Sequence, residues 1–462
     1  MPTPATLAEI GQRLDHLPVG QVHRRVVRAV GLGLFFEVYE IFLASSISAT
    51  LRTRYDVDGS ALKLLLASTF VGMFVGALAF GRLADRLGRR RAFLLNLSWF
   101  SLWSLVGACA PNAWVLVGSR FMAGIGVGAE YPVADSYLAD VLPKADRGRL
   151  AAWAYTLSFV AVPVLGFLAL YLDARVVFGL DGWRVLLIIG ALGAVIVALL
   201  RRGMPESPRW LASQGRFDEA AAAVKQFESG AYVHFGDTGE HVPAIVPASL
   251  EPEPAPDPEH PDRSRLWIWP YRQRVLMLTV FHYFQPFAYY GFGTLAALVL
   301  VSRGYSTTHS LMFTALSFVG YPVGSMLAIP LMRHVERKFL IMGSAVAVAL
   351  SGLLFATANH AFTIVVFGFV TTALCNVFSN AYHVYQAEIF PTDIRATAVG
   401  ATYSVSRLSS GLLPFLLIPV LDEFGATAMF GVVVGALVIV VGVIAAIGPR
   451  TSGRNLEDIN PV

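Results

Sequence analysis

The sequence predicts an all-α membrane protein with twelve transmembrane helices in two similar six-helix halves. Of its 462 residues, 55% are hydrophobic and 14% are charged, whereas soluble proteins carry about 25% charged residues. A soluble chain of this composition would expose too much apolar surface, and its hydrophobicity also excludes disorder over most of its length. Since a helix needs about 20 apolar residues to cross a bilayer, the apolar content suffices for about twelve helices.

Twelve apolar segments are long enough to cross a bilayer, and the basic residues orient them. Of the 35 Lys and Arg residues, six lie in or beside the loops of one side and two lie within spans, so most lie on the other side. Because cytoplasmic loops are enriched in Lys and Arg, we expect a multi-pass protein of the plasma (inner) membrane with both termini cytoplasmic. The predicted spans are residues 27–51, 61–81, 92–110, 113–140, 149–172, 183–202, 273–301, 308–331, 339–357, 361–386, 397–421 and 426–448.

The sequence also disfavours several other classes of protein. The net charge of +4 reflects the cytoplasmic loops rather than a surface for nucleic acid. Cys109 and Cys375 both lie in apolar segments and form neither a metal-ligand spacing nor a disulfide framework. The sequence has no Walker A run and no evident nucleophile–base arrangement. We therefore expect no metal, no cofactor, no nucleic-acid partner and no enzymatic activity, and we expect a monomer in the lipid bilayer.

One long polar stretch, residues 204–272, divides the spans into two groups of six. It begins with a predicted amphipathic helix at 217–227 and continues with an acidic, proline-rich run at 247–261, which is typical of a disordered linker. The sequence therefore predicts an N-terminal six-helix bundle (1–203), a cytoplasmic linker (204–272) and a C-terminal six-helix bundle (273–462).

The two groups of spans repeat each other with an offset of 248 residues. The segment DVLPKADR at 140–147 follows the fourth span, and the similar EIFPTDIR at 388–395 follows the tenth. At the same offset, GRLADRLGRR at 81–90 meets a degenerate copy at 331–338. Two loops that share one offset indicate duplicated halves, a recurrent transporter design with the binding site between the halves.

The same loops resemble a known family. GRLADRLGRRR at 81–91 is similar to the signature between helices two and three of the major facilitator superfamily (MFS). PESPRWL at 205–211 and RFMAGIGVG at 120–128 resemble the sugar-porter branch, and FQ followed by YYGFG within 284–293 looks more like bacterial metabolite:proton symporters. The resemblance covers the chain except residues 228–265. It implies the twelve-helix MFS fold, with a central cavity that opens alternately to each side.

Charged residues at the inner helix ends are candidates for a gate. Asp85 lies between cations, and a carboxylate near a helix end can bridge neighbouring helix termini. In the superfamily such contacts form a cytoplasmic gate between the halves, and the resemblance implies the same here. The alternative is a basic anchor that only orients the protein. The predicted gating residues are Asp85, Arg86, Arg89, Asp140, Arg147, Glu388 and Arg395.

Two acidic residues inside the first span are candidates for proton coupling. A charge in the middle of a bilayer costs about 2.5–3.5 kcal/mol, so such residues are functional candidates. Glu37 and Glu40 lie three residues apart on one helix face, where a carboxyl group could exchange a proton near neutral pH. Metabolite:proton symporters often carry acidic residues in helix one, and Glu37 is preferred because it lies nearer mid-span. The alternative is a structural ion pair with a neighbouring helix.

The fourth span adds two more candidates. The family places an arginine there beside the acid of helix one, which implies that Arg120 joins a Glu–Arg pair that opens on protonation; the alternative is an interfacial arginine. Glu130 follows a run of glycines at 124–128 that favours close helix packing. Because Glu130 lies beside a proline kink, it is a candidate for a second proton-carrying or substrate-binding group.

Arg407 is the most direct indication of the substrate. It lies about ten residues into the eleventh span, and the fork of a deep arginine suits a carboxylate or phosphate. Some organic-anion carriers of the superfamily use a helix-eleven arginine in this way; the alternative is a pair with a buried acid. Neutral polar residues of spans seven and ten suit a polar metabolite, although each alone is more often an interhelical hydrogen bond or core packing. These predicted substrate-binding residues are His282, Gln285, Tyr289, Asn376, Asn380 and His383.

These observations together predict a secondary active transporter that imports a small polar metabolite, such as an organic carboxylate or a sugar, with protons. One alternative is a proton-coupled efflux antiporter, although the fifth span keeps only Pro163 and Gly166 of the antiporter motif. A second is a membrane nutrient sensor, which is disfavoured because such sensors usually carry a long cytoplasmic tail.

Overall fold

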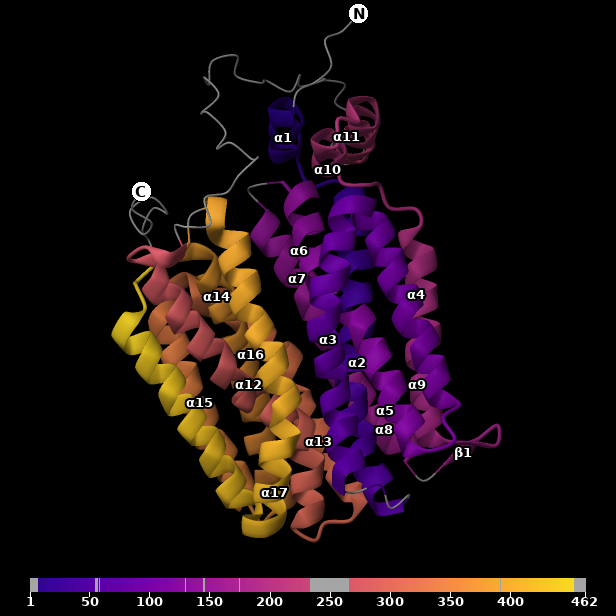
Figure 1. Cartoon of the computed structure of the whole chain (residues 1–462), viewed down its shortest axis with the longest axis vertical. Coiled ribbons are helices and arrows are strands. Elements are labelled where there is room, and N and C mark those ends of the chain that lie inside the picture. The colour runs from indigo at the N-terminus through magenta and orange to yellow at the C-terminus, as the bar shows by residue number, and fades with distance from the viewer. Residues whose placement is uncertain are drawn as a thin grey trace, which may run out of the picture.

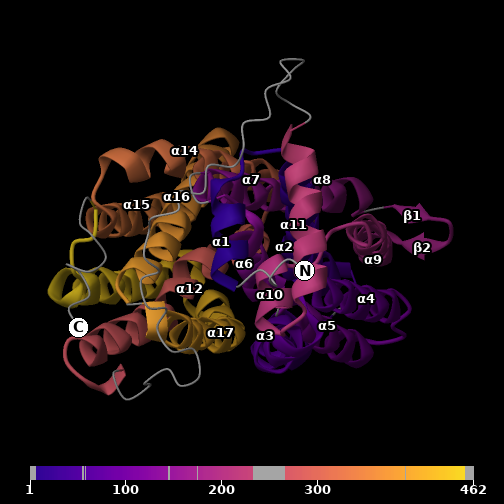
Figure 2. The same cartoon turned by 90° about the horizontal axis from the view of Figure 1, so that it is seen from above.

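The computed structural model is helical almost throughout and forms two bundles that stand side by side (Figure 1). The N-terminal helices, in indigo to magenta, form one bundle, and the C-terminal helices, in orange to yellow, form the other, as the view from above also shows (Figure 2). The structure describes residues 7–54, 57, 59–128, 130–143, 146–173, 175–232, 266–390 and 392–452, without the side chains at 7–9, 54, 78–86, 132, 230–232, 333, 392–393 and 395–397.

Each predicted span of the N-terminal half coincides with one helix or with two consecutive helices. The fourth and fifth spans are each divided near a residue that lies four positions before a proline. These residues are Gly128, before Pro132 in the fourth span, and Phe159, before Pro163 in the fifth. Proline lacks the backbone N–H that would bond to that residue's carbonyl, so the helix is interrupted there. The helices are α2 (Gln21–Arg54), α3 (Gly59–Leu87), α4 (Arg89–Ala108), α5 (Ala113–Val127), α6 (Glu130–Val141), α7 (Arg147–Phe159), α8 (Ala161–Leu172) and α9 (Gly182–Arg201).

The predicted spans of the C-terminal half are confirmed in the same way. The eighth span is divided at Val319. The helix before it ends at Phe318, which lies four positions before Pro322, so the same rule applies. The last two spans form one long helix with a kink at Gly425, where φ is 80°. By length and composition, eight stretches of the described helices could cross a membrane, and α5 is a shorter apolar helix. The helices are α12 (Tyr271–Ser302), α13 (Thr307–Phe318), α14 (Gly320–His334), α15 (Arg337–Thr357), α16 (Ala361–Glu388) and α17 (Thr392–Ile447).

Equivalent glycine contacts hold neighbouring helices together in both halves. A Cβ atom at Gly72 of α3 would lie 2.1 Å from the carbonyl oxygen of Phe121 in α5. A Cβ atom at Gly320 of α14 would lie 2.2 Å from the carbonyl oxygen of Phe369 in α16. Both residues of the second pair lie 248 positions after those of the first. The repeat read from the loops therefore extends to the way the helices pack, because only glycine permits this approach.

Substitution of a packed glycine should destabilise the protein. A Cβ atom at Gly76 would lie 2.0 Å from the carbonyl oxygen of Ile125, so Gly76→Ala forces α3 and α5 apart. We expect a loss of about 1–3 kcal/mol in the free energy of unfolding, measured as a lower thermal midpoint in detergent. Gly118→Ala is the matched control, because its Cβ atom would meet no atom within 4 Å. Equal midpoints for the two variants would contradict the packing described.

A layer of short helices covers one end of the N-terminal bundle (Figure 1). It consists of α1 (Leu7–His16), α10 (Pro208–Ser213) and α11 (Phe217–Tyr232). The sequence predicts α11, at 217–227, but neither α1 nor α10. Ile10 of α1 is fully buried in the apolar cluster of this layer, and Arg13 forms a 2.6 Å ion pair with Glu228 of α11. A helix as short as α1 depends on such contacts, because isolated helices of this length are marginal in water.

The loop between α8 and α9 forms a small hairpin that the sequence analysis does not predict. Strand β1 (Val176–Val177) pairs antiparallel with β2 (Leu180–Asp181). The two residues between the strands, Phe178 and Gly179, both have positive φ, which suits a two-residue turn. The proline-rich run at 247–261 lies outside the described residues, so the predicted linker and the domain boundaries stay predictions.

Candidate functional site

The carboxyl group of Glu40 lies in a closed ion pair at the centre of the N-terminal half. Arg120 donates from Nη1 to Oε2 of Glu40 at 2.5 Å, and both side chains are fully buried. Ser104 of α4 donates to Oε1 of Glu40 at 2.8 Å and accepts from Nη2 of Arg120 at 2.7 Å. The pair thus joins α2, α4 and α5. Arg120 therefore lies inside the bundle, and its partner in α2, the first predicted span, is Glu40.

Glu37, one turn before Glu40, has a different environment. Its side chain is fully buried, and neither carboxylate oxygen has a hydrogen-bond partner among the described residues. Arg407, in the other half of the protein, is its strongest attractive charge, and Glu130 repels it. An ionised carboxylate buried without a partner costs several kcal/mol, a cost that a bound proton removes. Glu37 is therefore suited to hold a proton in this conformation.

The guanidinium group of Arg407 is held by phenols rather than by a carboxylate. Nη1 donates to the hydroxyl of Tyr290 in α12 at 2.8 Å, and Nη2 donates to the hydroxyl of Tyr403 in α17 at 3.2 Å. Among the described residues, Arg407 forms no ion pair within 4.0 Å. The Arg407 residue is only 5% exposed. Glu37 attracts its positive charge from a distance, without a direct contact. This arrangement leaves the fork able to bind an anion that arrives from outside the protein.

Aromatic rings from both halves meet beside Arg407. Phe42 of α2 projects between Tyr289 and Tyr290 of α12, with ring centroids 6.4 Å apart in each case. Tyr321 of α14 lies 5.6 Å from Phe42 and 5.5 Å from Tyr289. Tyr289, a predicted substrate-binding residue, is therefore packed at the contact between the halves in this conformation.

A histidine cluster lies next to Tyr403. His282 of α12 and His383 of α16 both bond to Gln386, at 2.9 Å and 3.2 Å. Their rings lie 5.3 Å and 5.5 Å from the ring of Tyr403. The structure thus brings together two predicted substrate-binding residues and adds Gln386, which sequence reasoning missed. The spacing of three residues from His383 could have indicated Gln386 as a neighbour on the same helix face.

The three predicted amide residues differ in their contacts. Gln285, the equivalent of Glu37 at an offset of 248, is buried, and its Oε1 has no partner among the described residues. Asn376 donates to the backbone carbonyl of Tyr321 at 2.6 Å, so its amide group joins α16 to α14. Asn380 donates to the carbonyl of Asn376 at 3.0 Å. The alternative of an interhelical hydrogen bond therefore describes the donor group of Asn376. Its Oδ1, like Oε1 of Gln285, has no partner among the described residues.

Glu130 forms a second buried ion pair, with Arg201 at the end of α9. The Arg201 Nη1 to Glu130 Oε1 distance is 2.5 Å, and both side chains are almost fully buried. Arg201 also donates to the backbone carbonyls of Ala29 and Val30 in α2, at 3.1 Å each. The sequence analysis did not single out Arg201, which stands at the end of a predicted span beside Arg202. Its position inside the bundle carries no sequence signal.

The described gating residues form ion pairs that repeat between the halves. Arg89 lies 4.0 Å from Asp140 in the N-terminal half. Arg337 lies 2.9 Å from Glu388 in the C-terminal half, 248 positions later in both cases. Each pair joins two helices of one half. The side chains of Asp85, Arg86 and Arg395 lie outside the described residues.

Two further residues hold the ends of the N-terminal helices beside α1 in place. Arg147 donates to Asp15 of the short helix α1 at 2.9 Å. Glu206 accepts from the backbone N–H groups of Arg89 and Arg90, at 2.9 and 3.2 Å, and so caps the start of α4. Burial raises the pKa of Glu206, and these backbone donors oppose the rise in part. Glu206 was not predicted from the sequence.

The two halves are joined at the end opposite α1, α10 and α11 (Figure 1). There Arg52 at the end of α2 forms a 2.9 Å ion pair with Asp422 of α17. Beside it, the hydroxyl groups of Thr53 and Thr307 are 3.0 Å apart. These contacts connect the halves at one end of the molecule, and the contacts of Phe42 with Tyr289 and Tyr290 also connect them.

The chain is similar to known transport proteins over most of its length. The sequence model of a family described as "Sugar (and other) transporter" matches residues 29–462. The chain is 29% identical to the niacin transporter NiaP of Acinetobacter baylyi, over 98% of this chain and 99% of that protein. It is 26% identical to the gentisate transporter of Corynebacterium glutamicum, over 85% and 80%. A partially occluded inward-open structure of the xylose transporter XylE from E. coli matches with a TM-score of 0.73 at 19% identity, over 94% and 99%. The predicted MFS fold is thereby confirmed.

Proposed function

The chain belongs to the sugar (and other) transporter family, and we propose that it is a proton-coupled symporter that imports a small organic carboxylate. It acts in the plasma membrane as a monomer with both termini in the cytoplasm. The observation that carries the proposal concerns Arg407 and Glu37, which lie in different halves. Among the described residues, the buried cation of Arg407 is held by two phenols and the buried acid of Glu37 has no hydrogen-bond partner.

The surroundings of Arg407 favour a carboxylate over a neutral sugar. A bidentate guanidinium–carboxylate contact matches the geometry of the arginine fork. Tyr290 and Tyr403 each offer the substrate a hydroxyl group for hydrogen bonding and a ring face for packing. The rings of His282 and His383 lie beside the ring of Tyr403. Two relatives are named for niacin and gentisate, which are both aromatic carboxylates. An aromatic carboxylate is therefore the substrate class that we propose.

The proton is carried by Glu37 and passes to the cytoplasm with the substrate. In the conformation described, the halves are joined at the end that we assign to the outside, by Arg52 with Asp422. A carboxylate on Arg407 neutralises the positive charge that otherwise stabilises ionised Glu37. Substrate binding therefore favours the protonated form of Glu37, so that substrate and proton bind together. Glu40 and Arg120 form the second coupling element, since their pair must open if Glu40 is protonated.

Uptake into proteoliposomes tests this function. With an acidic outside, niacin or gentisate should accumulate against its gradient, and uptake should fall to the downhill level when the pH gradient is removed. Xylose is the neutral comparison substrate. The symport proposal fails if accumulation does not depend on the pH gradient, and the carboxylate proposal fails if xylose is accumulated in place of the acids. Accumulation driven by an inside-acid gradient would instead support the antiporter.

A further inference from the structure

Gln386 lies between two histidines and fixes which of their ring nitrogens carry hydrogen. Its Oε1 lies 2.9 Å from Nε2 of His282, and its Nε2 lies 3.2 Å from Nδ1 of His383. Because a carbonyl oxygen only accepts hydrogen bonds, Nε2 of His282 donates to Gln386. Because an amide nitrogen only donates, Nδ1 of His383 accepts and carries no hydrogen. The hydrogen of the neutral His383 ring is therefore on Nε2.

The surroundings of His282 support this direction of hydrogen bonding. Its side chain is fully buried, and Nδ1 has no hydrogen-bond partner among the described residues. If the amide group of Gln386 were turned round, it would donate to Nε2 of His282, and the ring hydrogen of His282 would move to the unpartnered Nδ1. Buried N–H groups without a partner are rarer than buried acceptors without one. The direction that leaves a lone pair on Nδ1 of His282 is therefore favoured.

His383 carries its Nε2–H close to Arg407. His383 is exposed, whereas its helix neighbours Tyr382 and Gln386 are buried. In the part of the chain that the structure describes, the His383 ring bonds to Gln386 through Nδ1, and no hydrogen bond engages Nε2. The His383 ring lies 5.5 Å from the ring of Tyr403, and the guanidinium carbon of Arg407 lies 5.1 Å from the same ring. The donor and the arginine fork thus lie against one phenol ring.

We propose that Nε2–H of His383 donates to an acceptor atom in the ring of the substrate, and that Gln386 is a positioning residue that fixes this donor. The proposal rests on the carboxylate site proposed at Arg407. A planar acid whose carboxylate binds Arg407 and whose ring packs against Tyr403 brings that ring towards His383. A pyridine nitrogen accepts the Nε2–H, whereas the C–H of a benzene ring leaves that donor without a partner. The substrate class is thereby narrowed to aromatic carboxylates with an acceptor in the ring.

Binding of aromatic acids of the same shape tests the proposal. Calorimetry with the purified full-length protein should show that the better bound of pyridine-3-carboxylate and pyridine-4-carboxylate binds about tenfold more tightly than benzoate. His383→Leu removes the donor, so this ratio should fall to about one while benzoate still binds. His383→Gln keeps an N–H donor and should retain a preference of about threefold.

The control and the contrary outcomes are as follows. His360→Leu removes another exposed histidine, at the opposite end of α16, and should keep the wild-type ratio. Equal binding of the pyridine acids and benzoate by the wild type, a ratio that survives in His383→Leu, or an equal loss in the control would overturn the inference and leave the carboxylate site at Arg407 intact. If no acid binds, that carboxylate site is wrong and this inference falls with it.

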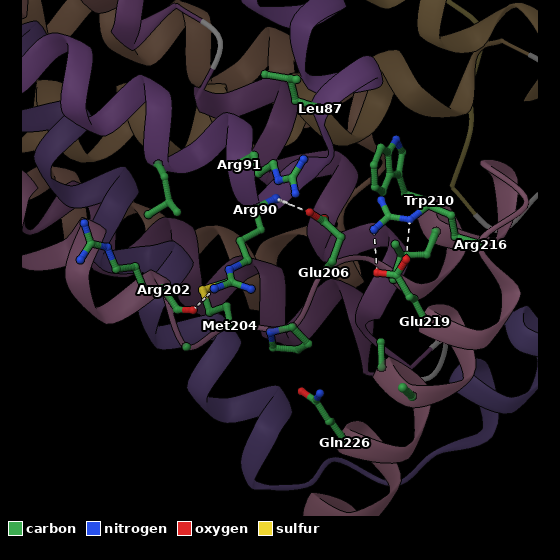
Figure 3. A pocket seen from close by; sticks show the side chains of 16 residues that line it. Leu87, Arg90, Arg91, Arg202, Met204, Glu206, Trp210, Arg216, Glu219 and Gln226 are labelled. Carbon is green, nitrogen blue, oxygen red and sulfur yellow. Dashed lines mark hydrogen bonds and ion pairs between the residues drawn. The ribbon is translucent and has the colours of Figure 1, made fainter.

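Nitrogen NMR of the protein with isotope-labelled histidine tests the role of Gln386. Wild-type His383, identified by the signals that disappear in His383→Gln, should show a protonated Nε2 and an unprotonated Nδ1. Gln386→Glu replaces the amide donor by an acceptor, so Nδ1 of His383 should gain a hydrogen. Gln226→Glu is the matched control on α11, in the cavity shown in Figure 3, and should leave these signals unchanged. A protonated Nδ1 in the wild type, or no response to Gln386→Glu, would overturn the positioning role; the wild-type spectrum decides even if Gln386→Glu folds poorly.

Discussion

Replacement of Arg407 by glutamine should lower the uptake of a carboxylate substrate at least about 100-fold. Loss of one member of a buried, hydrogen-bonded charge pair costs about 2–5 kcal/mol, and about 2.8 kcal/mol corresponds to 100-fold. Arg407 is the cation proposed to receive the substrate, and its present partners Tyr290 and Tyr403 cannot replace its charge. Initial rates of niacin or gentisate uptake in proteoliposomes, together with binding measured by calorimetry, check this expectation.

Two further variants separate an anion-binding role from a structural one. Arg407→Lys keeps the positive charge but loses the fork, so we expect about tenfold weaker carboxylate binding with an unchanged thermal midpoint. Arg272→Gln, an exposed arginine near the start of α12, is the control for the loss of a charge. The anion-binding role is wrong if Arg407→Lys transports the acids normally. It is also wrong if any variant impairs a neutral substrate as much as it impairs the acids.

The second large effect concerns Glu37. Glu37→Gln resembles the protonated acid in shape and charge, so the conformation described here should persist. We expect accumulation driven by a pH gradient to fall more than about tenfold, because the variant cannot release a proton. Exchange of labelled for unlabelled substrate at equal pH should continue, since that reaction needs no net proton movement. The thermal midpoint should stay the same or rise, because a buried acid without a hydrogen-bond partner is removed.

Glu40→Gln provides the contrast to Glu37→Gln. This change leaves Arg120 buried without its counter-charge, and such a loss costs about 3–5 kcal/mol. The Glu40 variant should therefore show a lower thermal midpoint, whereas the Glu37 variant should not. If both variants lose stability, Glu37 has a structural partner that contradicts its proposed role. If Glu37→Gln still accumulates substrate with the pH gradient, the proton is carried by another group.

The helices and their order were predictable because their signal is local. Uninterrupted apolar segments and the distribution of basic residues predicted all twelve spans, and proline positions explain where three of them divide. The offset of 248 residues, read from two loops, holds for the ion pairs of Arg89 and Arg337 and for the contacts of Gly72 and Gly320. The short helix α1 was missed, because its ten polar and apolar residues gain stability only from contacts with α10 and α11.

Local patterns in the sequence were enough to predict the membrane class, the twelve spans, the duplicated halves and the small set of charges inside the bilayer. The partners of those charges became known from the three-dimensional packing of the helices. Glu37 and Glu40 share one helix face and could not be told apart by spacing. Glu40 pairs with Arg120, whereas Glu37 has no hydrogen-bond partner among the described residues. Arg201, which the sequence analysis did not single out, neutralises Glu130 inside the bundle. The physical reason is that pairing depends on distances of a few ångströms between side chains on different helices. The rotation and packing of each helix set these distances, and no local sequence pattern contains that information.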